Sequence, residues 1–319
     1  MALLASTGCA GPLPPPDPPN LAGAKESLAS GHEQHKGGCY REAETNYLAA
    51  LEQARLSDNV LLLIRSLNSL GASLLAQGKV DEAAIYLEQA MNTSLGQPGQ
   101  PELDKVLGNL GSLAFKMKRY EDAENFWKNA AETARESGLS PAPYYCDLAR
   151  LYLAMSRDAD FTEMAAVALQ EAGGADEPAP DKKAGSSVEK KTVPDPATLA
   201  DALNLAGNSA RRAGNLQEAE NFYRRALELD RNTENTAGLA QDTEALGLLL
   251  LERGDIKEAV SFFDRAFFLW AALSEDQHRD RVFNMLKKLS QEHKTPVKLE
   301  PYSAARRDPA PYRLSSRCP

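Results

Sequence analysis

Apolar residues recur along the chain with the spacing of an α-helix. Five segments share one pattern, in which an apolar residue leads, alanine follows at +3, a large apolar residue at +7 and alanine again at +10. These offsets place all four residues on one helix face. The copies are YREAETNYLAA at 40–50, VDEAAIYLEQA at 80–90, YEDAENFWKNA at 120–130, LQEAENFYRRA at 216–226 and IKEAVSFFDRA at 256–266. The pattern predicts five helices whose alanines allow a neighbouring helix to come close.

A second recurring feature lies twelve residues before the first alanine of each copy. This position is glycine every time: Gly31, Gly71, Gly111, Gly207 and Gly247. Glycine within a helix costs about 1 kcal/mol relative to alanine, so its recurrence predicts a first helix that crosses the second at short range. Seven residues further on, we expect this first helix to end in a left-handed conformation. That position holds Gly38, Gly78, Lys118, Gly214 and Gly254.

The helix–turn–helix unit, with Leu-Gly in its first helix and alanine, a large residue and alanine in its second, resembles the tetratricopeptide repeat. The resemblance covers most of residues 24–291, with successive glycines 40 residues apart (71 − 31, 111 − 71 and 247 − 207). It implies an all-α, right-handed α-solenoid of about six repeats. The first helices would line a concave surface, and the second helices would form the outside.

Between the third and fourth regular copies, residues 144–172 fit a degenerate repeat whose first helix would hold Leu148, Ala149 and Tyr152. The segment that follows combines Gly, Pro, Ser and charge without an apolar stripe, which predicts a flexible linker. Asp195 before Pro196 predicts the start of the next helix.

These features predict six regions along the chain. They are a disordered, Pro-rich N-terminus at 1–22, repeats one to four at 23–172, the linker at 173–197, repeats five and six at 198–275, a capping helix at 276–292 and a disordered tail at 293–319. The capping helix contains DRVFNMLKKL at 280–289, whose apolar face would cover the open end of the solenoid. Neither end of the chain has enough periodic apolar residues to offset the entropy of ordering.

The resemblance also implies polar first-helix residues that face the groove and hold a partner's backbone or terminal carboxylate. The matching residues are Arg65, Asn68, Lys105, Asn109, Asn204, Asn208 and Arg211. The family's full set of clamp residues is not present, and the alternative is that these are solvated residues on exposed helix faces. The large residues at +7, among them Tyr47, Trp127, Tyr223 and Phe263, are expected in the core.

Composition, charge and the lack of certain motifs argue against several classes of function. The net charge of −9 and the lack of a basic face argue against nucleic-acid binding, and no apolar run is long enough for a transmembrane helix. The four cysteines have no CxxC spacing, and His32 and His35 have no ligand partner nearby in the sequence, so we expect no metal site and no cofactor. No nucleophile elbow or phosphate loop occurs, so we expect no enzyme.

The first residues, MALLASTGCAG, resemble the end of a bacterial lipoprotein signal peptide, with small residues before Cys9. Cys9 would carry the lipid, and the Pro-rich stretch at 11–19 would space the repeats from the periplasmic face of the outer membrane. Two features oppose this interpretation, because no Lys or Arg precedes Cys9 and the apolar stretch is short. The alternative is a cytoplasmic protein with a disordered N-terminus.

Together, these observations predict a scaffold or adaptor that binds a peptide or helix of a protein partner in the groove. With Cys9 lipidated, it would be an envelope-anchored assembly lipoprotein. The alternative is a cytosolic regulatory or co-chaperone-like adaptor. An enzyme with its site in the degenerate repeat and linker, at 144–196, is not favoured, since that segment has no acid–base or metal-ligand spacing.

Overall fold

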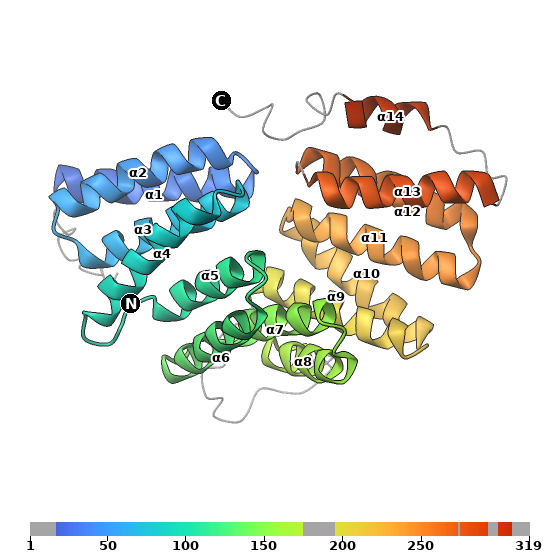
Figure 1. Cartoon of the computed structure of the whole chain (residues 1–319), viewed down its shortest axis with the longest axis horizontal. Helices are drawn as coiled ribbons and strands as arrows, with labels where there is room; N and C mark the ends of the chain where they lie inside the picture. Colours follow the sequence, from blue (N-terminus) through green and yellow to red (C-terminus); the bar gives the residue numbers. More distant parts are fainter. Residues whose placement is uncertain (1–16, 175–194, 274, 293–298, 308–319) are drawn as a thin grey trace, which may run out of the picture.

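The computed structural model describes residues 17–174, 195–273, 275–292 and 299–307, and these residues form fourteen helices and no strand. The helices of the first four pairs are α1 (Pro19–Lys36), α2 (Tyr40–Leu56), α3 (Val60–Ala76), α4 (Val80–Leu95), α5 (Leu103–Lys116), α6 (Tyr120–Glu136), α7 (Ala142–Ala154) and α8 (Asp158–Glu171). The remaining helices are α9 (Pro196–Arg212), α10 (Leu216–Asn232), α11 (Thr236–Arg253), α12 (Ile256–Ala272), α13 (Asp276–Glu292) and α14 (Glu300–Arg307). The all-α prediction is confirmed (Figure 1).

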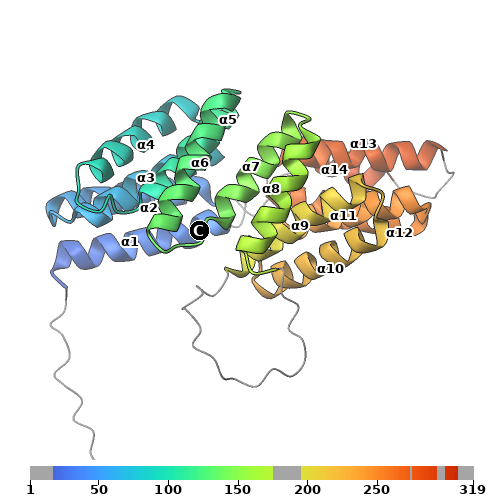
Figure 2. The ribbon, with the colours of Figure 1, turned by 90° about the horizontal axis from the view of Figure 1, so that it is seen from below.

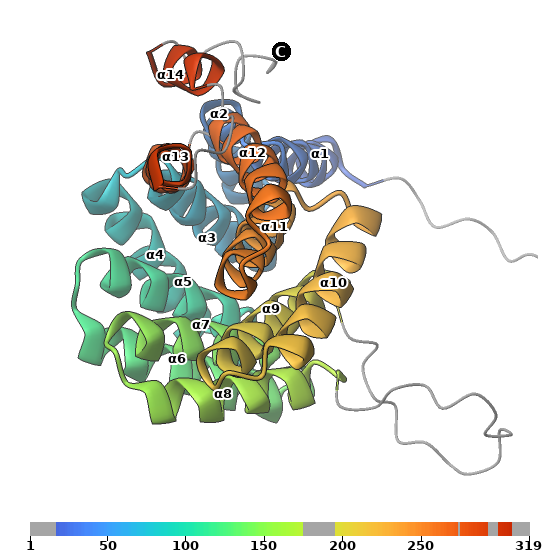
Figure 3. The same cartoon turned by 90° about the vertical axis from the view of Figure 1, so that its right-hand side faces the viewer.

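Six helix pairs, from α1–α2 to α11–α12, stack in chain order (Figures 1 and 2). Each second helix contacts the first helix of the following pair, and α3–α5, α7–α9 and α9–α11 show that first helices also contact one another. Figure 3 shows the pairs winding around a central axis, with α3, α5, α7 and α9 nearer the centre than α4, α6, α8 and α10. The first helices therefore form the inner face, as the repeat pattern predicts.

The recurring glycines and large residues meet at the crossing within each pair. A Cβ built on Gly31 would lie 2.5 Å from Cε1 of Tyr47, and one built on Gly247 would lie 2.8 Å from Cε1 of Phe263. The second helices bury the repeat alanines completely: Ala43, Ala50, Ala83, Ala90, Ala123, Ala130, Ala219, Ala226, Ala259 and Ala266. The turn positions have positive φ as expected, from 60° at Lys118 to 86° at Gly254.

The degenerate repeat, α7–α8, reverses the arrangement of large and small residues. In register with the other copies, Phe161 takes the place of the first alanine and Ala165 takes the place of the large residue, and both are fully buried. Ala149, also fully buried, stands where the other first helices have glycine. Because Ala165 is small, α8 can approach α7 without a glycine, and the ring of Phe161 occupies a different part of the interface.

Both ends of the described array differ from the sequence prediction. The predicted disordered N-terminus, 1–22, overlaps helix α1, which begins at Pro19 because proline suits the first turn of a helix. The predicted disordered tail, 293–319, contains helix α14, whose Tyr302 and Ala305 are buried. Tyr302 packs edge-on against Phe267 of α12 at 5.0 Å between ring centroids. Helices α13 and α14 thus both cover the end of the array, where a single capping helix was expected.

Among the helices of the described residues, none combines the length and apolar character required to span a membrane.

Candidate functional site

The inner face of the array carries two open cavities, each of about 400 Å³. The first lies along α1, α3, α5 and α7 and is lined by residues such as His32, Asn68 and Asn109. The second lies along α7, α9, α11 and α13 and is lined by residues such as Asn204, Asn208 and Arg281. Each cavity therefore crosses four neighbouring helices of the inner face, which alternate along the chain with the outer helices. This is the geometry of a groove for an extended guest.

In the first cavity, two predicted groove residues from neighbouring repeats form an amide pair. Asn109 of α5 donates from Nδ2 to Oδ1 of Asn68 of α3 at 2.8 Å. Within the described part of the chain, the amide nitrogen of Asn68 and the amide oxygen of Asn109 have no further hydrogen-bond partner. The amide nitrogen of Asn68, which carries two N–H donors, and the amide oxygen of Asn109 thus remain for the backbone of a guest.

The predicted cations beside this cavity are already paired. Arg65 donates to Oε1 of Glu102 at 2.7 Å, and Lys105 donates to Oε2 of the same carboxylate at 2.7 Å. Burial of Glu102 opposes its ionisation, but the hydrogen bonds from Lys105 and Arg65 outweigh burial and lower the pKa of Glu102. A guest carboxylate would have to compete with Glu102 for both cations. Arg65 and Lys105 therefore do not form the unpaired carboxylate-binding site that the resemblance implied.

The predicted residues of the second half also come together. Asn208 donates to Oδ1 of Asn204 at 2.9 Å, and its own Oδ1 accepts from the hydroxyl of Tyr223 at 3.1 Å. Asn204 in turn donates to Oδ1 of Asp242 of α11 at 2.7 Å. Arg211 forms an ion pair with Glu252 of α11. The seven predicted residues therefore form two separate groups, one in each half of the inner face.

The structure adds an aromatic wall that sequence analysis missed. Trp270 of α12 stacks on His278 of α13, with ring centroids 4.4 Å apart. Buried Glu244 accepts from Nε1 of Trp270 at 2.9 Å and from Nε of Arg281 at 2.7 Å. Trp270 lies four residues beyond the +10 alanine of its repeat, so the pattern assigned it no role, and its neighbours come from α11 and α13.

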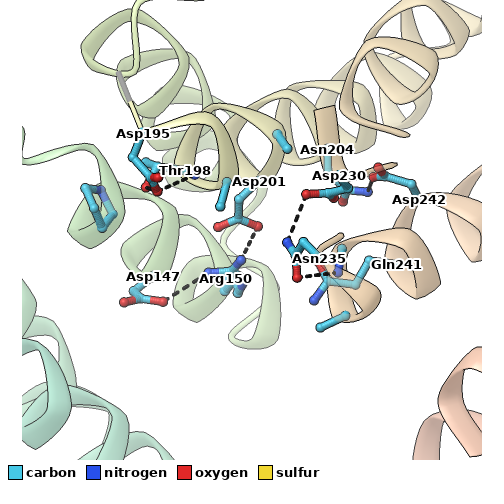
Figure 4. A pocket seen from close by; sticks show the side chains of 15 residues that line it. Asp147, Arg150, Asp195, Thr198, Asp201, Asn204, Asp230, Asn235, Gln241 and Asp242 are labelled. Carbon is cyan, nitrogen blue, oxygen red and sulfur yellow. Dashed lines mark hydrogen bonds and ion pairs between the residues drawn. The ribbon is translucent and has the colours of Figure 1, made fainter. Parts of the chain in front are cut away.

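A third cavity, of about 300 Å³, lies between α7, α9, the end of α10 and the start of α11 (Figure 4). Five aspartates line it, namely Asp147, Asp195, Asp201, Asp230 and Asp242. Arg150 is the basic side chain of this lining. Sequence analysis missed this acidic pocket because its carboxylates come from four helices and each resembles an ordinary solvated charge.

Burial perturbs the carboxyls of the acidic pocket. It raises the pKa of Asp242 to about 8 and the pKa of Asp230 to about 6, and the negative charge of Asp230 also raises that of Asp242. Desolvation within the pocket also raises the pKa of Asp147, although Arg150 opposes this shift and the side chain of Asp147 remains 31% exposed. These shifts favour the protonated form of Asp242 near neutral pH.

Comparison with known proteins agrees with the repeat architecture. Tetratricopeptide repeat family models match residues 28–94, 105–137 and 198–267. The chain is 35% identical over 69 residues to the Homo sapiens protein named Tetratricopeptide repeat protein 19, mitochondrial. These residues are 22% of this chain, and the match spans only 18% of that relative.

Solved structures share the fold at low sequence identity. Aspartyl phosphate phosphatase F from Bacillus subtilis is similar with a TM-score of 0.61 and 12% identity, over 93% of this chain and 72% of that one. The apo form of RapI is similar with a TM-score of 0.58 and 11% identity, over 92% of this chain and 98% of that one. Identities this low support the fold alone. The matched repeats and the stacked helix pairs show that the chain belongs to the tetratricopeptide repeat family.

Proposed function

We propose that the protein is a protein–protein interaction scaffold that binds an extended peptide or a helix of a partner along its inner face. The observation that carries this proposal is the pair of cavities, of about 400 Å³ each, that cross successive first helices. Tetratricopeptide repeat domains typically bind protein partners, and concave helical arrays offer long surfaces for this purpose. The proposed action is binding, without a catalytic step.

The amide pairs give the groove a way to hold a guest of variable sequence. Asn68 and Asn109 come from adjacent repeats and retain one unpaired amide nitrogen and one unpaired amide oxygen. A peptide backbone also presents alternating donors and acceptors, so such an amide pair can bind it whatever the guest's side chains are. Side chains of the guest would then contact His278, which stacks on buried Trp270, in the second cavity.

For the place of action, we propose anchoring at the bacterial envelope through a lipidated Cys9, with a cytosolic adaptor as the alternative. Cys9 lies outside the described residues, and the small residues before it support this proposal. Mass spectrometry of the N-terminal peptide from the native host tests it. A diacylglyceryl group on Cys9 supports the anchor, whereas an unmodified Cys9 in the soluble cytosolic fraction favours the alternative.

Site-specific photo-crosslinking in the native host tests the scaffold proposal with the full chain. The crosslinking amino acid p-benzoylphenylalanine would replace Ser112 in the first cavity or Leu248 in the second. Matched control positions are Glu88 of α4 and Glu228 of α10, which are exposed on the second helices. Circular dichroism of each variant checks that the repeats remain folded.

We expect the inner positions to give a discrete partner adduct that the outer positions do not give. An adduct shared by Ser112 and Leu248 would indicate one guest that spans both cavities. Inner positions that give no adduct, or the same adducts as Glu88 and Glu228, would count against a groove on this face.

A further inference from the structure

The acidic pocket beside the groove has more carboxylates than its own cations can neutralise. Nη1 of Arg150 lies 3.0 Å from Oδ1 of Asp147, and Nη2 of the same guanidinium pairs with Asp201, so one cation serves two carboxylates. Asp195 caps α9, since it accepts from the backbone nitrogen of Thr198 at 3.1 Å. Figure 4 shows Asp147, Arg150 and Asp201 together on one side of the pocket and Asp230 and Asp242 on the other.

The second pair of carboxylates is buried. Asp242 is 1% exposed and Asp230 is 2% exposed, and both line the pocket. Oδ1 of Asp242 accepts from Asn204 and Asp230 accepts from Nδ2 of Asn235 at 2.9 Å. Oδ2 of Asp242 has no hydrogen-bond partner within the part of the chain that the structure describes. Ionised Asp242 would leave this buried oxygen without a donor, which is unfavourable. A proton held between Asp242 and Asp230 takes that place when the pair is not fully ionised, and a guest cation would replace this proton.

The backbone of α11 at Gly238 leaves room for the carboxyl of Asp230 to approach closely. A Cβ built on Gly238, in the first turn of α11, would lie 1.8 Å from Oδ2 of Asp230. A side chain at position 238 would displace the carboxyl of Asp230, so the close packing of Asp230 and Asp242 depends on Gly238.

The chemistry of the cation that could replace this proton follows from the size and spacing of the site. No group of three or more His, Cys, Asp or Glu side chains among the described residues is close enough together to hold a metal ion. A cavity of about 300 Å³ has room for a side chain. Carboxylate and amide oxygens on opposite walls match the planar guanidinium, which has five donors in a fixed fork, better than a compact ammonium.

The pocket is also continuous with the groove. Asp147 lines both this pocket and the first cavity, and Arg150, Asp201 and Asn204 line both this pocket and the second cavity. An arginine of a guest in the groove could therefore extend into the pocket between the two cavities. We propose that the acidic pocket binds the guanidinium group of an arginine side chain from the protein partner, an inference that rests on the proposed scaffold function.

A direct binding measurement on the full chain tests this proposal. The probe is Nα-acetyl-L-arginine N-methylamide, and the matched controls are its citrulline analogue, which is uncharged, and its lysine analogue. Binding would be followed through the ¹⁵N side-chain amide signals of Asn204 and Asn235, which lie in the pocket. We expect the arginine probe to bind at least tenfold more tightly than either control.

Variants of the pocket locate the binding. Asp201→Asn removes a charge near Arg150, and Asp242→Asn keeps an acceptor for Asn204 while removing the buried carboxyl. Each variant should weaken binding of the arginine probe at least tenfold. Glu88→Gln, at an exposed position of α4, should leave the affinity for the probe unchanged. The assignment would be overturned if the citrulline analogue bound as tightly as the arginine probe or if the lysine analogue bound more tightly. It would also be overturned if neither pocket variant changed the affinity for the arginine probe.

Proton release provides a second readout. The charged groups that face the pocket are Asp147 and Arg150 of α7, Asp195 and Asp201 of α9 and its cap, Asp230 of α10 and Asp242 of α11. A guest cation favours the ionised carboxylates, so binding at pH 7 should release protons. Calorimetry in two buffers of different ionisation enthalpy measures this release, and Asp242→Asn should reduce it. No difference between the buffers for the native chain would contradict the proposal.

Failure of this inference can be distinguished from failure of the scaffold function. Partner adducts from Ser112 and Leu248 without binding of the arginine probe would support the scaffold function and contradict the arginine pocket. Binding of the arginine probe without partner adducts would support the pocket and contradict the proposed groove.

Discussion

Gly207 of α9 and Tyr223 of α10 are in direct contact where the two helices cross, because a Cβ added at Gly207 would lie 2.6 Å from Cε1 of the ring. The same relationship joins Gly71 to Leu87 and Gly111 to Trp127. Glycine in the first helix and a large residue in the second thus form one steric unit. This unit sets how closely each regular pair packs.

Replacing Gly207 with alanine tests this unit. Alanine is the better helix former by about 1 kcal/mol, yet the clash with Tyr223 should dominate and give a net loss of about 1 to 3 kcal/mol. Urea unfolding followed by circular dichroism measures the change. Gly37→Ala is the control, because its nearest new contact would be an ordinary 3.5 Å. Equal stability of the two variants would show that the Gly207 contact does not limit packing.

The repeat alanines give a second prediction. Ala83→Leu should overpack the crossing with α3 and cost about 1 to 3 kcal/mol, because Ala83 is fully buried. Glu82→Ala, one residue earlier, changes an exposed position and should alter the free energy of unfolding by less than about 0.5 kcal/mol. Similar losses at the two sites would contradict the packing assignment.

The pair α7–α8, in which the large and small residues are exchanged, gives a third prediction. Ala165→Phe restores the large residue of the regular repeats, but its ring should clash with the side chain of Ala149. Combining it with Ala149→Gly should relieve the clash, with a favourable coupling of about 0.5 to 3 kcal/mol in a double-mutant cycle. Urea unfolding of the four proteins in the cycle measures the coupling. Additive effects would mean that Ala149 and Ala165 do not share one contact.

Asp242 gives a prediction about pH. Its pKa in the folded chain is raised to about 8, mainly by burial, from an ordinary value of 3.8, so the folded state binds more protons between these values. Stability should therefore fall as pH rises from 5 to 8. Asp242→Asn cannot ionise, so its stability should fall less over this range, by on the order of 1 to 3 kcal/mol.

Thermal or urea unfolding at several pH values compares these profiles. Asp81→Asn, at the exposed first turn of α4, removes the same charge away from the pocket and should keep the native pH profile. Parallel profiles for the native chain and Asp242→Asn would contradict a raised pKa at Asp242.

Tyr302 gives a fifth prediction, at the end of the array. Its hydroxyl donates to Oδ1 of Asp264 at 2.6 Å and its ring is buried against Phe267. Tyr302→Ala should cost about 3 kcal/mol and Tyr302→Phe about 1 kcal/mol in unfolding experiments. Arg307→Ala, at an exposed position of α14, is the control. A stability of Tyr302→Ala equal to that of the control would show that α14 is not docked.

The repeat units could be predicted from sequence because their packing depends on residues at fixed, short offsets. Gly71, Ala83 and Leu87 lie within seventeen residues, and all three take part in one crossing. The ends could not be predicted in the same way. Helix α14 has only Tyr302 and Ala305 to bury, and α1 begins within a Pro-rich stretch, so neither has a periodic signal at its boundary.

The candidate site was only partly predictable. The repeat register places Asn68, Asn109, Asn204 and Asn208 on the inner face, where the structure has them. Their pairing depends on contacts between repeats, as with Asn68 and Asn109 at 41 residues apart, and the register alone does not specify it. The acidic pocket depends on the order in which α7, α9, α10 and α11 stack, which no local pattern contains.

The exchange of large and small residues in α7–α8 also affects which helices can pair during folding. The five regular pairs share one combination, so a first helix from one of them could dock wrongly on the second helix of another. Such mispairing of helix α7 is disfavoured, because the methyl group of Ala149 would collide with Tyr47, Trp127 or another large residue at the regular position. The irregular repeat thus distinguishes the two halves of an otherwise repetitive chain, and it reduces the number of wrong neighbours that each half can find.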